Sequence, residues 1–215
     1  SYDDNFHEGN RYYYCDGGYS CHSESNGTIY ESNNYISYFD DYSFIFENES
    51  SNFIIDGFTF NTGKNISLEN SSCTIKNSKI ISTQTYGVLN RSVDDYSGLL
   101  LNVNIGNPLF ENVVFENKTL SYPNTEGDGS WIKLSDSSPS FTNCAFNNLN
   151  THVSGNASYR YGNVIYQSSG DATFDNCTFS GNSLTTDNNA DLKGGVYYLE
   201  TGSASFDGST FSHNS

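Results

Sequence analysis

Apolar residues recur in pairs, five positions apart, in six short segments that share the pattern apolar-x-(Asn or Gly)-x-x-apolar. Successive segments begin 20 to 35 residues apart, a spacing typical of solenoid and array proteins. Because equivalent residues of stacked repeats lie on one another, we predict that these pairs form two columns of a stacked core. The predicted core residues are Ile55, Phe60, Ile75, Ile80, Phe110, Phe115, Phe141, Phe146, Phe174, Phe179, Phe206 and Phe211.

Further apolar positions lie nine residues upstream of each pair, and also seven residues upstream except at Asn48 and Gln167. Positions two apart share one face of a strand. β-branched and aromatic residues dominate these runs, and Gly, Ser and Asn interrupt them, which disfavours helices. We therefore predict an all-β fold, a single-stranded parallel β-helix of about six coils over residues 43–215. The Tyr-rich residues 1–42 are expected to cap the first coil, because an open end exposes unpaired strand edges. The column nine residues upstream is Phe46, Ile66, Leu101, Ile132, Ile165 and Tyr197.

The third position of each segment is Asn or Gly, residues that tolerate a left-handed backbone. We expect a bend there, with the Asn side chains forming an inward amide ladder. Polar inserts follow most segments, at about 83–97, 117–128, 148–161 and 181–194. Insertions in solenoids map to one face, so this edge is where we expect function. The predicted ladder residues are Asn77, Asn112, Asn143 and Asn176, with Gly57 and Gly208 in the same column.

One form of the repeat reads Phe-x-Asn-Cys-x-Phe-x-x-Asn and follows a Gly-Gly-apolar element. Its fullest copies run from Phe174 to Asn182, and from Lys193-Gly-Gly-Val-Tyr-Tyr198 into the segment that ends at Asn214. This motif resembles the repeat of chlamydial polymorphic outer membrane proteins, related forms of which occur in surface proteins of protists. The resemblance covers roughly residues 43–215. It implies a right-handed parallel β-helix at a cell surface, often with an adhesive role.

Composition narrows the range of partners. Nine Lys and Arg face 25 Asp and Glu, so the formal net charge is −16, and no basic stripe is present for nucleic acid. The same charge disfavours anionic membranes and polyanionic polysaccharides. No run of 18 apolar residues occurs, so we expect no transmembrane helix and no membrane insertion. The sequence contains no Met, and we expect a chain processed after a signal peptide or excised from a longer one.

Eight Asn-x-Ser/Thr sequons occur in the chain, a density that favours N-glycosylation and an extracellular or cell-surface location. An Asn- and Ser-rich sequence also produces some sequons by chance. Asn176 belongs to the predicted inward ladder, so we expect it to remain unmodified. The sequons predicted to carry glycans are Asn26, Asn48, Asn65, Asn70, Asn90, Asn117 and Asn156.

Five cysteines are present. Cys15 and Cys21 flank a Gly-Gly bend, and we predict a disulfide between them, in keeping with an oxidising compartment. Cys144 and Cys177 share a column on adjacent coils, where parallel stacking gives awkward disulfide torsions. Buried thiols are favoured there over a bridge, and Cys73 is also expected to be a buried packing residue.

Candidate catalytic groups are few. Many parallel β-helices cleave polysaccharides, and glycosidases need two carboxylates across a groove. The acidic candidates near strand ends are Asp171, Asp175 and Asp207, and we interpret them as solvated surface residues. No catalytic residue and no enzyme activity are therefore predicted. Asp187-Asn-Asn-Ala-Asp191 has the opening spacing of a calcium loop, although Leu192 stands where Gly is expected. A solvated acidic loop is favoured, and no cofactor is predicted beyond N-linked glycans.

These features together predict an extracellular, glycosylated structural or adhesive β-helix protein. The expected partner is a second copy, because a last coil open at Phe206 and Phe211 needs cover. The N-terminal region of the next subunit would provide that cover in a head-to-tail filament. Glycans or cell-surface components are further candidate partners. The alternative reading is a carbohydrate-binding or pectate-lyase-like, polysaccharide-cleaving β-helix.

Overall fold

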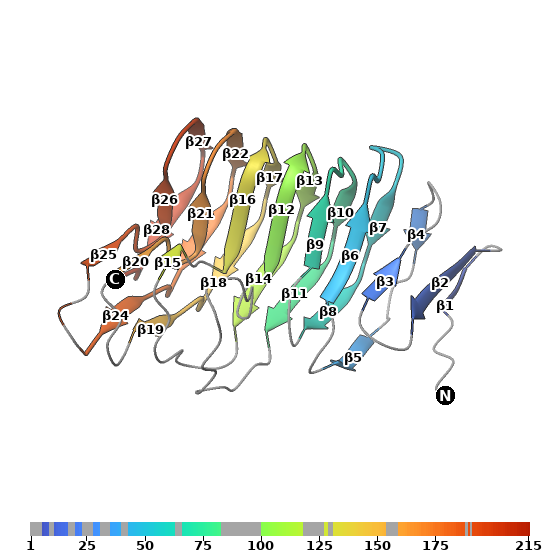
Figure 1. Cartoon of the computed structure of the whole chain (residues 1–215), viewed down its shortest axis with the longest axis horizontal. Helices are drawn as coiled ribbons and strands as arrows, with labels where there is room; N and C mark the ends of the chain where they lie inside the picture. The colour runs from blue at the N-terminus through green and yellow to red at the C-terminus, as the bar shows by residue number, and fades with distance from the viewer. Residues whose placement is uncertain are drawn as a thin grey trace.

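The computed structural model is all-β over the residues that it describes, and its parallel strands stack as a β-solenoid. Figure 1 shows the strands side by side along the long axis, from the N-terminal strands on the right to the C-terminal strands on the left. The prediction of a stacked parallel β fold is therefore confirmed. The described residues are 6–8, 11–16, 20–22, 28–30, 35–39, 43–62, 66–82, 100–117, 127–128, 131–153, 159–187, 189 and 191–215.

The first wall of the solenoid, which we call sheet I, has nine strands. From β3 onward its neighbours pair in parallel, while β1 and β2 pair antiparallel at its N-terminal edge. In order across the sheet, the strands are β1 (Phe6–Glu8), β2 (Arg11–Asp16), β3 (Ser20–His22), β6 (Ser43–Glu47), β9 (Ile66–Glu69), β12 (Leu101–Gly106), β16 (Ile132–Ser137), β21 (Ile165–Gln167) and β26 (Tyr197–Leu199).

The two other walls, sheet II and sheet III, have seven parallel strands each. Sheet II consists of β4 (Thr28–Tyr30), β7 (Ile54–Asp56), β10 (Thr74–Lys76), β13 (Leu109–Glu111), β17 (Ser140–Thr142), β22 (Asp171–Asp175) and β27 (Ser203–Asp207). Sheet III consists of β5 (Tyr35–Phe39), β8 (Thr59–Thr62), β11 (Lys79–Ser82), β14 (Val114–Asn117), β18 (Ala145–Asn147), β23 (Thr178–Ser180) and β28 (Thr210–Ser212).

One coil takes one strand from each sheet, as in β6, β7 and β8. The same three-strand unit is present upstream of residue 43, because β3, β4 and β5 pair in parallel with β6, β7 and β8. Stacking thus begins within the segment assigned to the cap. The antiparallel β1–β2 hairpin lies beyond β3 at the edge of sheet I.

The predicted core columns are in register. In sheet II, Ile75 pairs with Phe110, Phe141 with Phe174, and so on through Phe206. The sheet III column runs likewise from Phe60 to Phe211. The upstream alignment was wrong in one place, because Phe46 pairs with Leu68 rather than with Ile66. The corner between β6 and β7 is two residues longer than that between β9 and β10, and a shift of two keeps Phe46 on the inner face.

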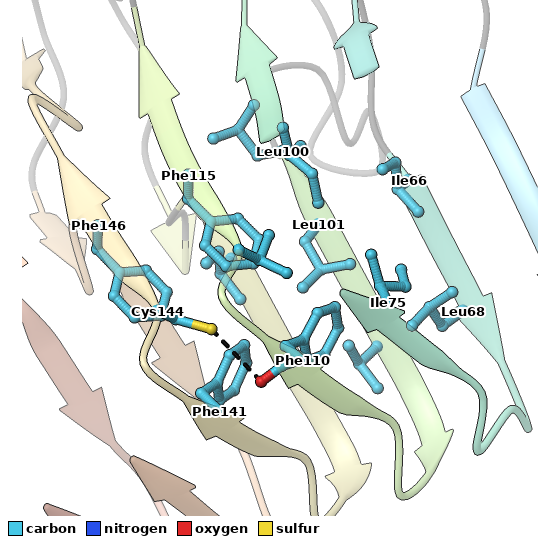
Figure 2. Packing of buried hydrophobic residues seen from close by; sticks show 14 of the residues in the cluster. Ile66, Leu68, Ile75, Leu100, Leu101, Phe110, Phe115, Phe141, Cys144 and Phe146 are labelled. Carbon is cyan, nitrogen blue, oxygen red and sulfur yellow. Dashed lines mark hydrogen bonds between the residues drawn. The ribbon is translucent and has the colours of Figure 1, made fainter. Parts of the chain in front are cut away.

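The core consists of rings that lie flat on one another from coil to coil. Figure 2 shows Phe141 beside Phe110 and Phe146 beside Phe115, with Ile66, Leu68 and Ile75 in the neighbouring coil. The ring centroids of Phe110 and Phe141 are 4.7 Å apart with 8° between the planes, and those of Phe115 and Phe146 are 4.9 Å apart with 3°. Within a coil, the Phe141 and Phe146 rings meet edge to face at 5.6 Å. Both arrangements suit the quadrupole of an aromatic ring.

The Asn column bends the backbone as predicted but does not point inward. Asn77, Asn112, Asn143 and Asn176 have φ between 49° and 54°, the left-handed region that Asn tolerates. All four are exposed, so the inward amide ladder was wrongly placed. Asn112 Nδ2 does donate to Asn77 Oδ1 at 3.1 Å, on the outside of the coil.

The inward amides lie instead three residues after the second Phe of the motif. Asn182 is fully buried, and its Nδ2 donates to the carbonyl of Phe146 at 3.0 Å. Asn214 repeats this contact one coil on, donating to the carbonyl of Phe179 at 2.9 Å. Asn182 Nδ2 also donates to Asn214 Oδ1, which links the two coils. The last Asn of the repeat is therefore its structural amide.

Candidate functional site

The inserts of the C-terminal coils form strands of their own. β15 (Gly127–Asp128), β20 (Tyr159–Tyr161) and β25 (Asp191–Lys193) make a three-stranded parallel sheet, and β19 (Thr151–Val153) pairs with β24 (Leu184–Thr186). From the sequence, we predicted that these inserts lie together at one edge, but as polar loops rather than strands. Their strands are too short and too polar to have been recognised from periodicity. Residues 83–99, which include the insert at 83–97, lie outside the described residues.

Tyrosines join the insert sheet to sheet I. Tyr166 and Tyr198 are register partners on β21 and β26, with stacked rings 5.7 Å apart. Tyr161, from the insert strand β20, stacks on Tyr198 at 5.1 Å, and Tyr159 lies 5.1 Å from Tyr161. Tyr166 is buried, whereas Tyr159 is 37% exposed. We call Tyr159, Tyr161, Tyr166 and Tyr198 the tyrosine cluster, an aromatic surface that sequence analysis missed.

Charged groups border the tyrosine cluster. Lys193 Nζ lies 4.7 Å from the centroid of the Tyr161 ring, within the range of a cation–π contact. Asp191 lies 3.0 Å from Lys193 Nζ, and its hydrogen bond raises the pKa of Lys193. Tyr166 Oη donates to Glu200 Oε2 at 2.5 Å. The cluster therefore offers ring faces next to both signs of charge.

The second candidate site is the open edge of the last coil, formed by β26, β27 and β28. Phe206 and Phe211 stack on Phe174 and Phe179, with centroids 4.8 and 4.7 Å apart. Their outer faces are uncovered, so Phe206 is 37% exposed and Phe211 50%, while their column neighbours are buried. Leu199 of β26 is 38% exposed. We call Leu199, Phe206 and Phe211 the open apolar edge.

A buried glutamine lies near this edge. Gln167 is fully buried in a column that is otherwise apolar, between Leu134 and Leu199. Its Nε2 donates to the carbonyl of Gly170 at 2.6 Å and to that of Ser203 at 3.1 Å, and its Oε1 accepts from the hydroxyl of Tyr197. Both ends of the amide are thus satisfied, which explains how the column tolerates a polar residue.

The predicted glycosylation sites divide into three groups. Asn48 and Asn70 are exposed at one corner of the solenoid, and both have positive φ. Asn117 is only 5% exposed, so its placement in an exposed insert was wrong, and Asn176 is exposed instead. Asn26, Asn65, Asn90 and Asn156 lie outside the described residues.

The described thiols are buried. Cys73, Cys144 and Cys177 are free, and Cys144 and Cys177 donate to the carbonyls of Phe110 and Phe141 at 3.4 Å. Burial raises the pKa of the Cys73 thiol to about 12. The hydrogen bond with Cys177, together with burial, raises the pKa of Cys144. Cys73 and Cys144 therefore pack as small apolar groups rather than as nucleophiles, since the thiolate is the reactive form.

The backbone positions of Cys15 and Cys21 are directly opposite each other in the antiparallel β2–β3 pair. Opposed residues in such a ladder have Cα atoms about 4.5–5.5 Å apart. This spacing falls within the range that disulfides span, about 4.4–6.8 Å. The Cys15–Cys21 disulfide stays a prediction.

The acidic candidates are dispersed on the surface. Asp175 and Asp207 are exposed register partners on sheet II, and Asp171 accepts a hydrogen bond from Ser203 at 2.7 Å. Across the described residues, His, Cys, Asp and Glu form no group of three or more that could hold a metal ion. Residues 188 and 190 of the acidic segment 187–191, which was interpreted as a solvated loop rather than a calcium site, lie outside the described residues.

Comparison with known proteins adds no further assignment. No family model, no curated protein and no solved structure matches this chain. Over the part of the chain that the structure describes, no helix has the length and apolarity needed to cross a bilayer.

Proposed function

We propose that this chain is an extracellular, glycosylated structural component of a surface, and that copies of it associate end to end. Its finer architecture in this proposal is a right-handed single-stranded parallel β-helix of about six coils over residues 43–215, with an N-terminal cap within residues 1–42. The resemblance of its repeat to those of chlamydial polymorphic outer membrane proteins and protist surface proteins supports the surface location, as do the exposed sequons at Asn48, Asn70 and Asn176.

The observation that carries the proposal is the open apolar edge. Phe206 and Phe211 continue columns whose members are covered in every coil from β10 to β23, and the unpaired backbone of β26, β27 and β28 surrounds them. Burying an apolar side chain of this size stabilises by about 1.5–3 kcal/mol, so the edge favours a further coil stacked on it. A row of unpaired strand edges is also a template for pairing with another chain.

The opposite end of the solenoid offers matching positions. In sheet II the column of Phe206 begins at Ile29 on β4, and in sheet III the column of Phe211 begins at Ile36 on β5. Head-to-tail stacking of two copies would therefore bring apolar residues of both columns to the junction, while in sheet I β26 of one copy would meet the β1–β2 hairpin of the next. The β1–β2 hairpin lies on sheet I alone, so it leaves β4 and β5 as the terminal strands of sheets II and III.

Sedimentation velocity at increasing protein concentration tests this proposal. The unmodified chain should form a ladder of species that grow with concentration, and Phe211→Lys should shift it toward the monomer because a charge would be buried at the junction. Thr210→Lys is the matched control, since it adds the same charge on the same strand at an exposed position outside the column. An unmodified chain that remains a single species at all concentrations would refute end-to-end association.

A second candidate function is carbohydrate binding, favoured by the tyrosine cluster. Tyr159 combines an exposed ring with the neighbouring carboxylate of Asp191 and ammonium of Lys193, groups that can stack on and hydrogen-bond to a neutral sugar. Glycan-array binding that is lost in Tyr159→Ala, but kept in Phe211→Lys, would support this function over assembly.

A further inference from the structure

Two of the sequon asparagines are neighbours in space although they lie 22 residues apart in the sequence. Asn48 follows β6 and Asn70 follows β9, at the same corner of adjacent coils. Their φ angles are 58° and 50°, and both side chains are exposed. Asn48 N–H donates to the carbonyl of Glu69 at 2.9 Å, which places the two corners against each other.

The two amides share a hydrogen bond that involves the atom to be modified. Asn70 Nδ2 donates to Asn48 Oδ1 at 2.8 Å. In N-glycosylation, a lipid diphosphate-linked oligosaccharide is the donor, and its C1–O bond to the diphosphate breaks as a C1–Nδ2 bond forms. Nδ2 loses one proton to a base, and the lipid diphosphate leaves. Asn48 Oδ1 accepts the hydrogen bond from Asn70. Asn48 Nδ2, the atom that would be glycosylated, therefore lies on the other side of the Asn48 amide, away from Asn70.

Space at this corner is limited. Neighbouring strands are about 4.8 Å apart, and a branched oligosaccharide is wider than this spacing. A glycan on Asn48 leaves its Oδ1 free to accept from Asn70. A glycan on Asn70 takes one hydrogen from the donor nitrogen and crowds the corner occupied by Asn48. Two glycans would force the adjacent corners of β6 and β9 apart.

We infer that Asn48 and Asn70 form one paired modification site, which carries a single N-glycan in the folded chain, on Asn48. This inference rests on the proposed extracellular, glycosylated nature of the protein. Glycan transfer precedes folding, and Asn48 enters the secretory compartment before Asn70. Chains modified at both positions cannot close the stack and are retained in the cell, while chains modified at Asn48 alone fold and are secreted.

Asn176 serves as an internal control for the pairing argument. It is exposed, with φ of 52°, in the same kind of corner position. Its neighbours in the column, Asn143 and Gly208, do not belong to sequons. A glycan on Asn176 therefore has no competing glycan on either adjacent coil.

Fractional glycan occupancy, measured on the full chain secreted from a eukaryotic host, tests the inference. Lys64 separates Asn48 from Asn70 in a tryptic digest. Asn26 shares the peptide of Asn48, and Asn65 shares that of Asn70, so electron-transfer fragmentation assigns each glycan within its peptide. The two occupancies should together not exceed one, with Asn48 close to fully occupied. Ser50→Ala removes the first sequon and keeps Asn48, and Asn70 occupancy should then rise severalfold. Asn48→Asp should do the same, and it keeps the acceptor oxygen. Thr178→Ala, which removes the Asn176 sequon, should leave Asn70 unchanged.

The failures of the two proposals are distinguishable. Secreted chains with both Asn48 and Asn70 largely occupied overturn the paired site and leave the glycoprotein proposal intact. Asn70 occupancy that does not respond to Ser50→Ala or Asn48→Asp also overturns it. A chain with no glycan at any sequon overturns the paired site and the glycosylated surface protein together.

Discussion

At the scale of single residues, stability comes from side chains that stack on equivalent side chains in the next coil. The Phe146 ring lies 4.9 Å from that of Phe115 and 4.5 Å from that of Phe179, nearly parallel to both. Edge-to-face contacts with Phe141 and Phe174 fill the remaining sides. A ring in mid-column is therefore enclosed on all sides, whereas Phe211 at the edge has one open face.

Truncation of these rings should show this difference. Phe146→Ala should lower the free energy of unfolding by about 3–5 kcal/mol, because the cavity lies between two coils. Phe211→Ala, the matched change at the end of the same column, should cost roughly half as much or less, since half of that side chain is exposed. Urea unfolding in dilute solution measures both values. Equal losses would contradict the column geometry.

Cys73 should make the protein sensitive to alkaline pH. Its thiol has a pKa near 12 in the folded chain because burial disfavours the thiolate, against about 8.5 for an exposed cysteine. Above pH ~8.5 the unfolded chain releases a proton that the folded chain retains, so stability falls as pH rises toward 12. Between pH 8 and pH 10, the titration of Cys73 should lower the free energy of unfolding by about 2 kcal/mol.

Cys73→Ala isolates this contribution. Alanine occupies the equivalent column position at residues 172 and 204, so the substitution suits the site. The difference in unfolding free energy between wild type and Cys73→Ala should shrink with rising pH, while the tyrosines titrate equally in both. Parallel pH profiles for the two proteins would show that Cys73 keeps an ordinary pKa.

At the scale of elements, the sequence predicted the strands better than the corners. The two Phe columns of sheets II and III were predictable because their pattern repeats without a gap. The predicted alignment of β6 was wrong by two residues. Inward-facing residues repeat every two positions along a strand, so the pattern looks the same when a corner is two residues longer. The inward amide was assigned to Asn176 rather than to Asn182 because both positions carry Asn in the motif. Only the contact of Asn182 with the Phe146 carbonyl distinguishes them.

The candidate sites were less predictable than the strands. The columns of Phe206 and Phe211 follow directly from the repeated pattern. The tyrosine cluster does not, since it depends on the β20 strand folding against sheet I, a contact between segments with no shared periodicity. The pairing of Asn48 with Asn70 was hidden for a similar reason, because the shifted alignment did not bring these two corners together.

Glycines fix some corners by close backbone approach. Gly170 has φ of 91°, and a Cβ there would lie 2.0 Å from the carbonyl oxygen of Ser137 in the coil below. Gly170→Ala should destabilise the protein by about 2 kcal/mol or more, through both the positive φ and the clash. Gly195→Ala is the control, because its nearest neighbour, the Ser215 oxygen, is 3.7 Å away. Thermal melts that shift equally for the two variants would rule out this corner geometry.

At the scale of the whole molecule, the stacked coils fit the structural role that we propose. The charge of −16 keeps lateral faces apart, while the apolar columns run along the axis and end in the open apolar edge. In the proposed assembly, copies therefore join along the axis rather than side by side. Glycans at the corner of Asn48 would strengthen that preference, because they project from the side of the solenoid and not from its end.

Electron microscopy of the purified chain at high concentration tests the central claim most directly. The account predicts unbranched fibres one solenoid wide, with coils about 4.8 Å apart within each copy. Dispersed particles of a single length, with no fibres at any concentration, would contradict end-to-end stacking through Phe206 and Phe211.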